Sequence, residues 1–182
     1  MKKLLVIVLL ILAISPVQGD EELAPYTYVT AAPGGRYYFK MYTIQGRDYD
    51  RNIGRGELYA VRNPGPDKIL WRTSGWYAFQ VFLSFDGAYL VRLGNWPRGH
   101  KPSHKHLGVA FYKNGKLLKS YSTKDLIEDM KQVRPSVSHY QYLDESIPPG
   151  LVEDYGYLFR LKSVDGIVYV FDMKTGKVKS RD

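Results

Sequence analysis

Hydrophobic and polar positions alternate in short runs along most of the chain, from residue 26 to the C-terminus. These runs are rich in Tyr, Val, Leu and Phe, which favour β-strands, and glycine turns separate them. The clearest turns are Asp86-Gly87, Asn114-Gly115 and Asp165-Gly166, because such pairs tolerate the positive φ angles of a type I′ hairpin. Thr175-Gly176 and Pro33-Gly34-Gly35 are looser versions. The pattern predicts an all-β fold.

One stretch departs from this pattern, SYSTKDLIEDMKQV between Ser120 and Val133. Ser122 and Asp125 have the spacing of a helix capping box, and apolar residues follow at helical intervals, at Leu126, Ile127, Met130 and Val133. We therefore expect one short helix that covers an edge or end of a sheet and stops before Pro135. The segment Asp144–Gly156 has paired prolines and no strong periodicity, which predicts a long surface loop.

The strand pattern repeats along the chain. APGGRYYFK, SFDGAYLVR and SVDGIVYVF, which begin at Ala32, Ser84 and Ser163, each place a glycine turn before a strand rich in aromatic or branched residues. A second pattern follows as GELYAVRNPGPDKILWRT, GVAFYKNGKLLKSYS and IVYVFDMKTGKVKS, in which a strand and a turn precede a strand with lysine or arginine on its outer positions. Each unit is expected to form a small antiparallel meander.

These repeats resemble the blades of β-propeller proteins, and SFDGAYLV, VAFYKNGKLLKSY and GIVYVFDMKTGKV carry the resemblance. The chain also resembles a group of small, uncharacterised bacterial secreted proteins with the same order of features, a group that implies no activity. Propellers typically have 4 to 8 blades of about 40 to 50 residues, and the chain without its N-terminal apolar segment is short for four blades of average length. The expected architecture is two to three antiparallel blade-like meander sheets that do not close into a full propeller.

The N-terminus has the features of a secretory signal peptide. Lys2 and Lys3 precede an apolar run of 11 residues from Leu4 to Ile14, and small residues follow before Asp20. Cleavage is expected near Gly19, which leaves residues 20–182 as a single domain that is secreted or periplasmic. The alternative is a membrane anchor, but a spanning helix needs about 18 apolar residues. The chain has no cysteine, which excludes disulfides and lipidation on cysteine.

The chain is basic, with a formal net charge of +8. An exported protein of this charge is expected to meet an acidic polysaccharide, a membrane surface or an acidic protein rather than nucleic acid. The alternative is that the charge only maintains solubility. An unclosed stack of sheets also has exposed faces or edges, which the helix, the N-terminal segment or a second copy of the chain would cover.

Three of the four histidines, His100, His104 and His106, lie in the stretch HKPSHKH. Neutral imidazoles bind zinc or copper, so these residues are the candidates for a metal site. Three cations beside them, Arg98, Lys101 and Lys105, oppose a divalent ion, and the stretch contains no carboxylate or cysteine. A solvated basic loop between two strands is the other interpretation. No cofactor fingerprint occurs in the sequence.

Catalytic candidates are few. Ser138 and His139 are adjacent, but on a strand they point to opposite faces, and no Gly-x-Ser-x-Gly motif is present. Carboxylates that could act in pairs on a glycan occur in the predicted helix and loop, at Asp125, Glu128, Asp129, Asp144, Glu145, Glu153 and Asp154. None of these groups is in a context that predicts a catalytic residue.

Aromatic residues are the strongest compositional signal, with 16 tyrosines, three tryptophans and seven phenylalanines. Most fall at alternating strand positions and are expected to pack in the core. Trp76, Tyr77 and Trp96 lie near turns instead and, with Arg98, are the candidates for an aromatic and basic binding surface.

The sequence therefore favours an exported, non-catalytic module that binds another macromolecule or itself. Two alternatives stay open at this point. One is an exported hydrolase that acts on a glycan or a peptide, and the other is metal capture through the loop from His100 to His106.

Overall fold

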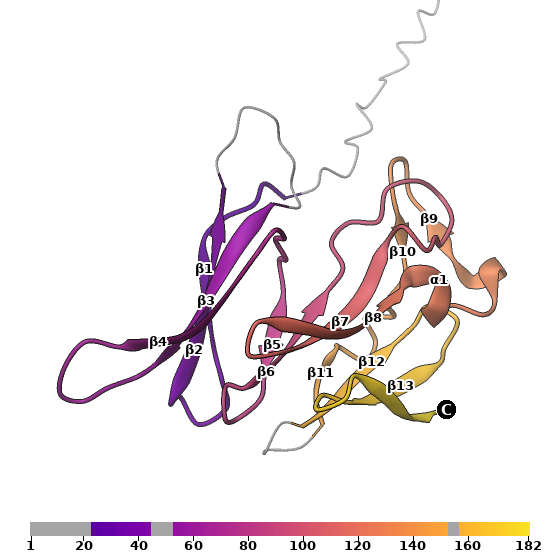
Figure 1. The fold of residues 1–182 in the computed structure, drawn as a ribbon. Helices are drawn as coiled ribbons and strands as arrows, with labels where there is room; N and C mark the ends of the chain where they lie inside the picture. Colours follow the sequence, from indigo (N-terminus) through magenta and orange to yellow (C-terminus); the bar gives the residue numbers. More distant parts are fainter. Residues whose placement is uncertain (1–22, 45–52, 153–156) are drawn as a thin grey trace, which may run out of the picture.

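The computed structural model describes residues 23–44, 53–152 and 157–182 (Figure 1). The strands form three four-stranded antiparallel meanders and one two-stranded ribbon, with a single short α-helix, and none of the sheets closes on itself. This arrangement confirms the predicted all-β fold with propeller-blade-like sheets. The proposed signal peptide, residues 1–19, lies outside the described residues. Within the described ranges, no helix is both long and apolar enough to span a membrane.

The three meanders follow one another along the chain. Sheet 1 contains β1 (Tyr28–Ala31), β2 (Tyr37–Thr43), β3 (Gly54–Ala60) and β4 (Lys68–Ser74). Sheet 2 contains β5 (Val81–Leu83), β6 (Tyr89–Leu93), β7 (Leu107–Lys113) and β8 (Lys116–Ser122). Sheet 3 contains β11 (Gly150–Leu151), β12 (Leu158–Lys162), β13 (Val168–Asp172) and β14 (Lys177–Arg181), and β9 (Arg134–Pro135) pairs with β10 (Tyr140–Gln141).

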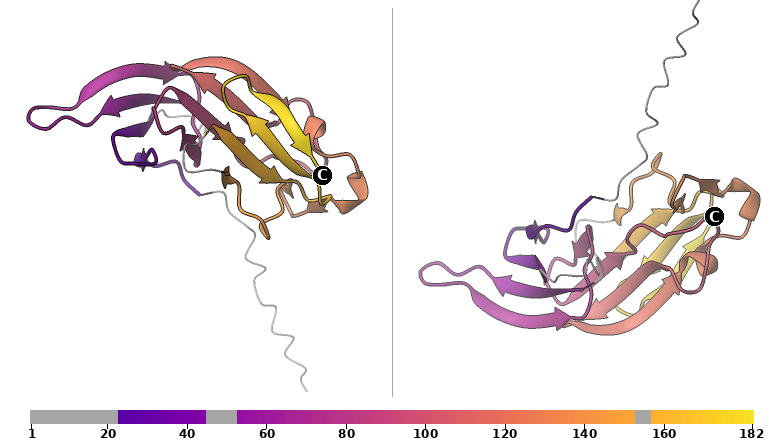
Figure 2. Two further views of the ribbon diagram at one scale, coloured as in Figure 1. Left: turned by 90° about the horizontal axis from the view of Figure 1, so that it is seen from below. Right: turned by 90° about the horizontal axis from the view of Figure 1, so that it is seen from above.

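Sheet 2 is the middle layer of the stack, as the order of colours in Figure 2 shows. Two apolar clusters lie on its two faces. Leu90 and Tyr112 belong to a cluster with Phe39 of sheet 1, whereas their neighbours Val91 and Phe111 belong to a cluster with residues of sheet 3. Because both faces of sheet 2 are buried at its inner strands, β6 and β7 are apolar at nearly every position rather than at every second one, whereas the edge strand β8 is largely exposed.

The repeated turns have the same geometry. The amide N–H of Gly35, Gly87 and Gly166 donates to the carbonyl of the residue three positions earlier, at N···O distances of 3.0, 2.9 and 2.9 Å. Asn114 and Gly115 have φ angles of +47° and +78°, as a type I′ hairpin requires. Sheet 3 nevertheless differs from the other two in the position of this turn. Its Gly166 turn joins the second and third strands, whereas the Gly35 and Gly87 turns join the first and second strands of sheets 1 and 2. The additional edge strand β11 lies within Asp144–Gly156, so the prediction of a loop throughout that segment is wrong.

The helix α1 (Thr123–Leu126) is shorter than the sequence predicts. The predicted capping box is present, with reciprocal hydrogen bonds between Ser122 and Asp125. Beyond Leu126 the chain turns extended, because the amides of Glu128 and Asp129 donate to Oδ2 of Asp165 at 2.7 and 3.1 Å. A 3-10 turn over Met130–Gln132 follows, so the expectation of helical periodicity as far as Val133 is wrong. The apolar side chains of the segment still pack on the cluster between sheets 2 and 3.

The outer face of sheet 1 carries a polar and aromatic network, which we call the Glu57 network. Glu57 is only 8% exposed, and its carboxylate accepts hydrogen bonds from Tyr59 Oη at 2.5 Å, Arg72 Nε at 3.0 Å and Tyr42 Oη at 3.1 Å. The cations of Lys40 and Arg55 lie over the ring of Tyr42, at 4.8 and 4.6 Å from its centroid. Cations thus lie over the aromatic ring of Tyr42 on this face. A polar outer face is expected for the terminal sheet of an open stack, because that face is in contact with water.

Candidate functional site

The last strands of the three meanders, β4, β8 and β14, form what we call the outer strands. They carry basic side chains and no acidic ones, with Lys68, Arg72, Lys116, Lys119, Lys177, Lys179 and Arg181 as the basic residues. The outer strands are largely exposed. The arrangement therefore puts basic residues along one edge of each four-stranded sheet, where Arg72 and Arg181 pair with Glu57 and Glu128.

Two glycine turns hold the outer strands next to one another. A Cβ atom at Gly115 would lie 2.3 Å from the carbonyl oxygen of Arg72 in β4, and a Cβ atom at Gly176 would lie 2.7 Å from Cβ of Lys119 in β8. Each turn thus packs directly on the preceding sheet, close to its outer strand. Side chains larger than glycine do not fit at this approach, so the spacing of the basic edges is set by these two residues.

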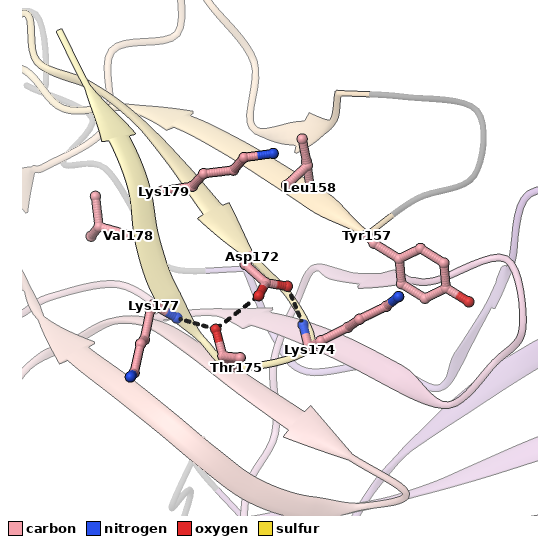
Figure 3. A pocket seen from close by; sticks show the side chains of 8 residues that line it. All are labelled: Tyr157, Leu158, Asp172, Lys174, Thr175, Lys177, Val178 and Lys179. Carbon is pink, nitrogen blue, oxygen red and sulfur yellow. Dashed lines mark hydrogen bonds between the residues drawn. The ribbon is translucent and has the colours of Figure 1, made fainter.

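A groove opens beside the turn that joins β13 to β14 (Figure 3). Its volume is about 570 Å³, and three lysines, Lys174, Lys177 and Lys179, line it together with Tyr157, Leu158, Asp172, Thr175 and Val178. In the part of the chain that the structure describes, none of the three lysines forms an ion pair. The groove, which we call the lysine groove, therefore presents cations to solvent beside an apolar lining.

The single carboxylate that lines the lysine groove, Asp172, accepts hydrogen bonds from residues of the β13–β14 turn. Asp172 accepts hydrogen bonds from the Lys174 amide at 2.8 Å and from Thr175 Oγ1 at 3.0 Å (Figure 3). The ammonium group of Lys174 lies 3.9 Å from the ring centroid of Tyr157. The Tyr157 hydroxyl donates to Asp86 Oδ2 at 2.9 Å, and this hydrogen bond raises the pKa of Tyr157. Tyr157 is thereby fixed between sheets 2 and 3 and gives the groove a rigid wall.

The aromatic and basic surface predicted from the sequence is not assembled. Trp76 and Tyr77 are 7% and 0% exposed, and both belong to the cluster between sheets 1 and 2, so the prediction that they face a ligand is wrong. Trp96 is half-buried and stacks on His139, with 3.6 Å between the ring centroids. Arg98 is exposed beside it and forms a β-bridge with His139. Trp96 and Arg98 thus lie at the end of the molecule that holds the histidine loop.

The three histidines of that loop do not converge on one point. His100 Nε2 lies 3.3 Å from the carbonyl of Val137, His104 Nδ1 lies 3.5 Å from Asp125 Oδ1, and His106 Nδ1 lies 2.9 Å from Tyr140 Oη. Among the residues that the structure describes, no group of three His, Cys, Asp or Glu side chains could hold a metal ion. The loop is instead fastened by separate polar contacts.

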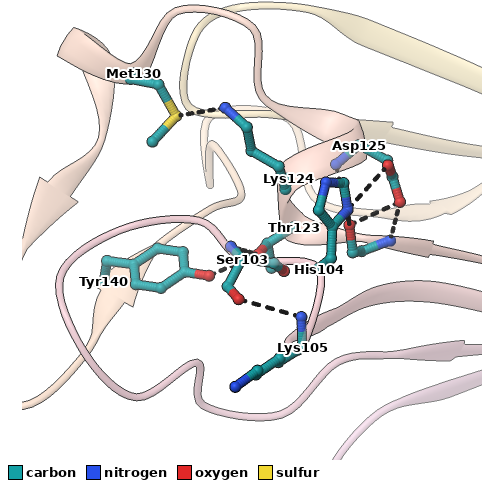
Figure 4. Close-up of polar contacts among 9 residues, drawn as sticks. Ser103, His104, Lys105, Thr123, Lys124, Asp125, Met130 and Tyr140 are labelled. Carbon is teal, nitrogen blue, oxygen red and sulfur yellow. Dashed lines mark hydrogen bonds and ion pairs between the residues drawn. The ribbon is translucent and has the colours of Figure 1, made fainter.

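The contact of His106 continues into a buried hydrogen-bonded chain. Thr123 Oγ1 donates to the carbonyl of Ser103 at 3.2 Å and lies 2.6 Å from Tyr140 Oη (Figure 4). Tyr140 Oη thus lies within hydrogen-bond distance of both His106 Nδ1 and Thr123 Oγ1. The contacts fix the loop to α1.

The catalytic candidates also have structural partners. His139 Nδ1 is buried and makes no hydrogen bond in the described part of the chain, and its ring lies against Trp96. Asp125 caps α1, Glu128 pairs with Arg181, Asp129 caps the 3-10 turn, and Asp144 pairs with Lys162 at 2.8 Å. That ion pair holds the pKa of Asp144 far below its usual range. Glu145 is exposed, and Glu153 and Asp154 lie outside the described residues.

Sequence reasoning missed two features. The lysine groove is built from lysines in KTGKVK, whose alternate spacing around the turn was a usable signal. Glu57 lies in the apolar run GELYA, and burial of a carboxylate there is unfavourable unless hydrogen-bond donors surround it.

The sequence matches no protein family model and no curated protein. The WD40 beta propeller domain of Doa1 is a solved structure to which the chain is similar, at 13% sequence identity and a TM-score of 0.25. The match covers 90% of this chain and 69% of that one. A likeness this low carries no argument about function, and the resemblance to small secreted bacterial proteins stays a prediction.

Proposed function

We propose that the protein is a non-catalytic binding module that holds an anionic macromolecule against its outer strands. The observation that carries the proposal is the distribution of charge, since the outer strands have basic residues and no carboxylate, and the lysine groove adds Lys174. Four of the acidic candidates, Asp125, Glu128, Asp129 and Asp144, cap turns or pair with cations, which supports binding over catalysis.

The physical basis is electrostatic attraction between several exposed lysine and arginine side chains and the negative charges of the partner, each contact being weak. An exposed lysine contributes little alone, but several of one sign on one edge raise the local concentration of an anion and speed its association. Such binding weakens as salt rises, because exposed charges are screened beyond about 10 Å at 0.1 M ionic strength.

The test uses residues 20–182 with heparin and poly-L-glutamate as probes, measured by isothermal titration at 50 and 500 mM NaCl. We expect binding at low salt that falls at least tenfold at high salt. Lys119→Ala, Lys177→Ala and Lys179→Ala together should weaken it at least tenfold. The matched control removes the same charge from exposed lysines elsewhere, Lys101→Ala, Lys105→Ala and Lys131→Ala. Equal loss in both triple variants, or no binding of either probe at 50 mM NaCl, contradicts the proposal.

We also propose that the chain is exported and cleaved near Gly19. The supporting feature is the N-terminal order of lysines, an apolar run of 11 residues and small residues. Expression of the whole chain in bacteria, followed by N-terminal sequencing of the exported fraction, tests it. A product that keeps Met1, or that stays in the cytoplasm, contradicts it.

A further inference from the structure

We propose that the anionic partner is an acidic segment of another protein, which pairs in an extended conformation with the free edge of β14 and becomes a fifth strand of sheet 3. This inference rests on the proposed function and names the partner for it. Its ligand is a peptide strand with acidic side chains at alternate positions.

The backbone of β14 is exposed at the edge of sheet 3. All five of its residues are exposed, and among the described strands it pairs only with β13, as the last strand of sheet 3. Asp182, directly after it, exchanges two backbone hydrogen bonds with Val168 of β13, at 3.1 and 2.8 Å. Because backbone groups alternate in direction along a strand, the N–H and C=O of Arg181 point away from β13. These unpaired groups are a template for another strand.

The lysine groove lies on the face of sheet 3 that adjoins this edge, because its lining extends from β14 to Leu158 of β12. Lys177 and Lys179 of β14 line it, and Lys174 closes the end at the turn (Figure 3). Leu158 and Val178 supply the apolar part of its lining. An added strand with carboxylates at every second position would place them within reach of these ammonium groups, and its aliphatic residues would meet the apolar part.

The charge of the outer strands decides which kind of strand can pair with β14. A second copy of this chain would bring its own outer strands, all of which are basic, so edge-to-edge pairing of two copies is repulsive. An acidic strand is instead attracted to β14, because its negative charges complement the lysines there. The same lysines that discourage self-association therefore select an acidic segment.

The direct experiment compares two probes that have the same side chains. One is a seven-residue peptide of alternating glutamate and valine with blocked ends, and the other is its peptoid, whose side chains sit on nitrogen and which has no amide N–H. We expect the peptide to bind residues 20–182 at least tenfold more tightly than the peptoid by fluorescence anisotropy. In NMR hydrogen exchange, the Arg181 amide should slow at least tenfold when the peptide is bound.

Two variants test the side-chain part. Lys177→Glu with Lys179→Glu should weaken peptide binding at least tenfold, whereas Lys101→Glu with Lys105→Glu changes the charge equally on an exposed loop and should weaken it less than twofold. If the groove variant does not fold, the comparison of peptide with peptoid on the unchanged protein decides the question.

The outcomes separate this inference from the proposed function. If heparin and poly-L-glutamate bind but the peptide and peptoid bind equally, or if the Arg181 amide is unaffected, strand pairing is overturned and the anion-binding module stands. Stronger binding of heparin than of the peptide, with the same dependence on Lys177 and Lys179, would make a polysaccharide the partner and also overturn it. If no anion binds, both proposals fall.

Discussion

At the scale of single residues, Glu57 shows how a carboxylate is kept inside a sheet. The hydrogen bond from Tyr59, reinforced by those from Arg72 and Tyr42, holds the pKa of Glu57 below its usual value despite burial. The folded state therefore favours the ionised group more than the unfolded chain does. The stability from this preference is present above the unfolded pKa of about 4.3 and is lost as pH falls through the folded pKa.

We predict that Glu57→Gln lowers the free energy of unfolding by about 1–3 kcal/mol at pH 7, because charge-assisted hydrogen bonds become neutral ones or are lost. The difference between the variant and the parent should shrink as pH falls through the folded pKa of Glu57, which lies below the unfolded value of about 4.3. Guanidinium unfolding at several pH values measures both effects. Glu145→Gln, at an exposed carboxylate, is the control, and an equal loss in it would contradict the explanation.

The residue scale is also where sequence reasoning was least reliable. Trp76 and Tyr77 follow a glycine turn, which suggested exposure, yet they fill the space between sheets 1 and 2. A tryptophan near a turn has the same local sequence whether it points inward or outward, and the decision depends on a neighbouring sheet. Lys177 and Lys179 have a regular strand spacing, but only the fold shows that they share a groove with Tyr157.

At the scale of elements, the glycine turns act as spacers between sheets. Gly115 and Gly75 have similar φ angles, +78° and +82°, but a Cβ at Gly75 would meet nothing within 4 Å, whereas one at Gly115 would press on the carbonyl of Arg72. We predict that Gly75→Ala costs about 1–2 kcal/mol from the positive φ angle alone. Gly115→Ala should cost about 1–3 kcal/mol more, because β4 must move. Equal costs by guanidinium unfolding would show that the turn is not a spacer.

The end of α1 depends on a residue far away in the sequence. The capping box of Ser122 is a local signal and was predicted correctly, but Asp165 stops the helix, and it lies about 40 residues later in the repeated turn of sheet 3. Local periodicity alone, from Leu126 to Val133, indicated a longer helix. The beginning of this element could thus be predicted from the sequence, and its end could not.

We predict that Asp165→Ala releases the amides of Glu128 and Asp129, whose hydrogen exchange should become faster. The free energy of unfolding should fall by about 1–3 kcal/mol, since two amides lose their acceptor. The Gly87 amide, in the corresponding turn of sheet 2, is the internal control and should keep its protection. Unchanged exchange at Glu128 and Asp129 would mean that Asp165 does not hold the segment.

At the scale of the whole molecule, the repeats correctly indicated a stack of blade-like sheets, and none of the described sheets closes on itself. The extra strand β11 was not predictable, since a two-residue strand has no periodicity of its own and exists only by pairing with β12. The stack also implies a particular division of stability. Each apolar cluster joins two neighbouring sheets, and sheet 2 contributes to both clusters.

In such a linear arrangement, the free energy of unfolding is expected to be a sum of contributions from each sheet and from each contact between neighbouring sheets. A substitution in one cluster should therefore destabilise the two sheets of that cluster first. We predict that Phe39→Leu, in the cluster between sheets 1 and 2, costs about 1–3 kcal/mol and speeds hydrogen exchange of β2 and β3 while β12 and β13 keep their protection. Phe171→Leu, in the other cluster, should have the converse effect. Uniformly faster hydrogen exchange in all three sheets of either variant would show that the stack unfolds as one unit. Binding of a ligand at β14 would then protect sheet 1 only by stabilising the whole folded state.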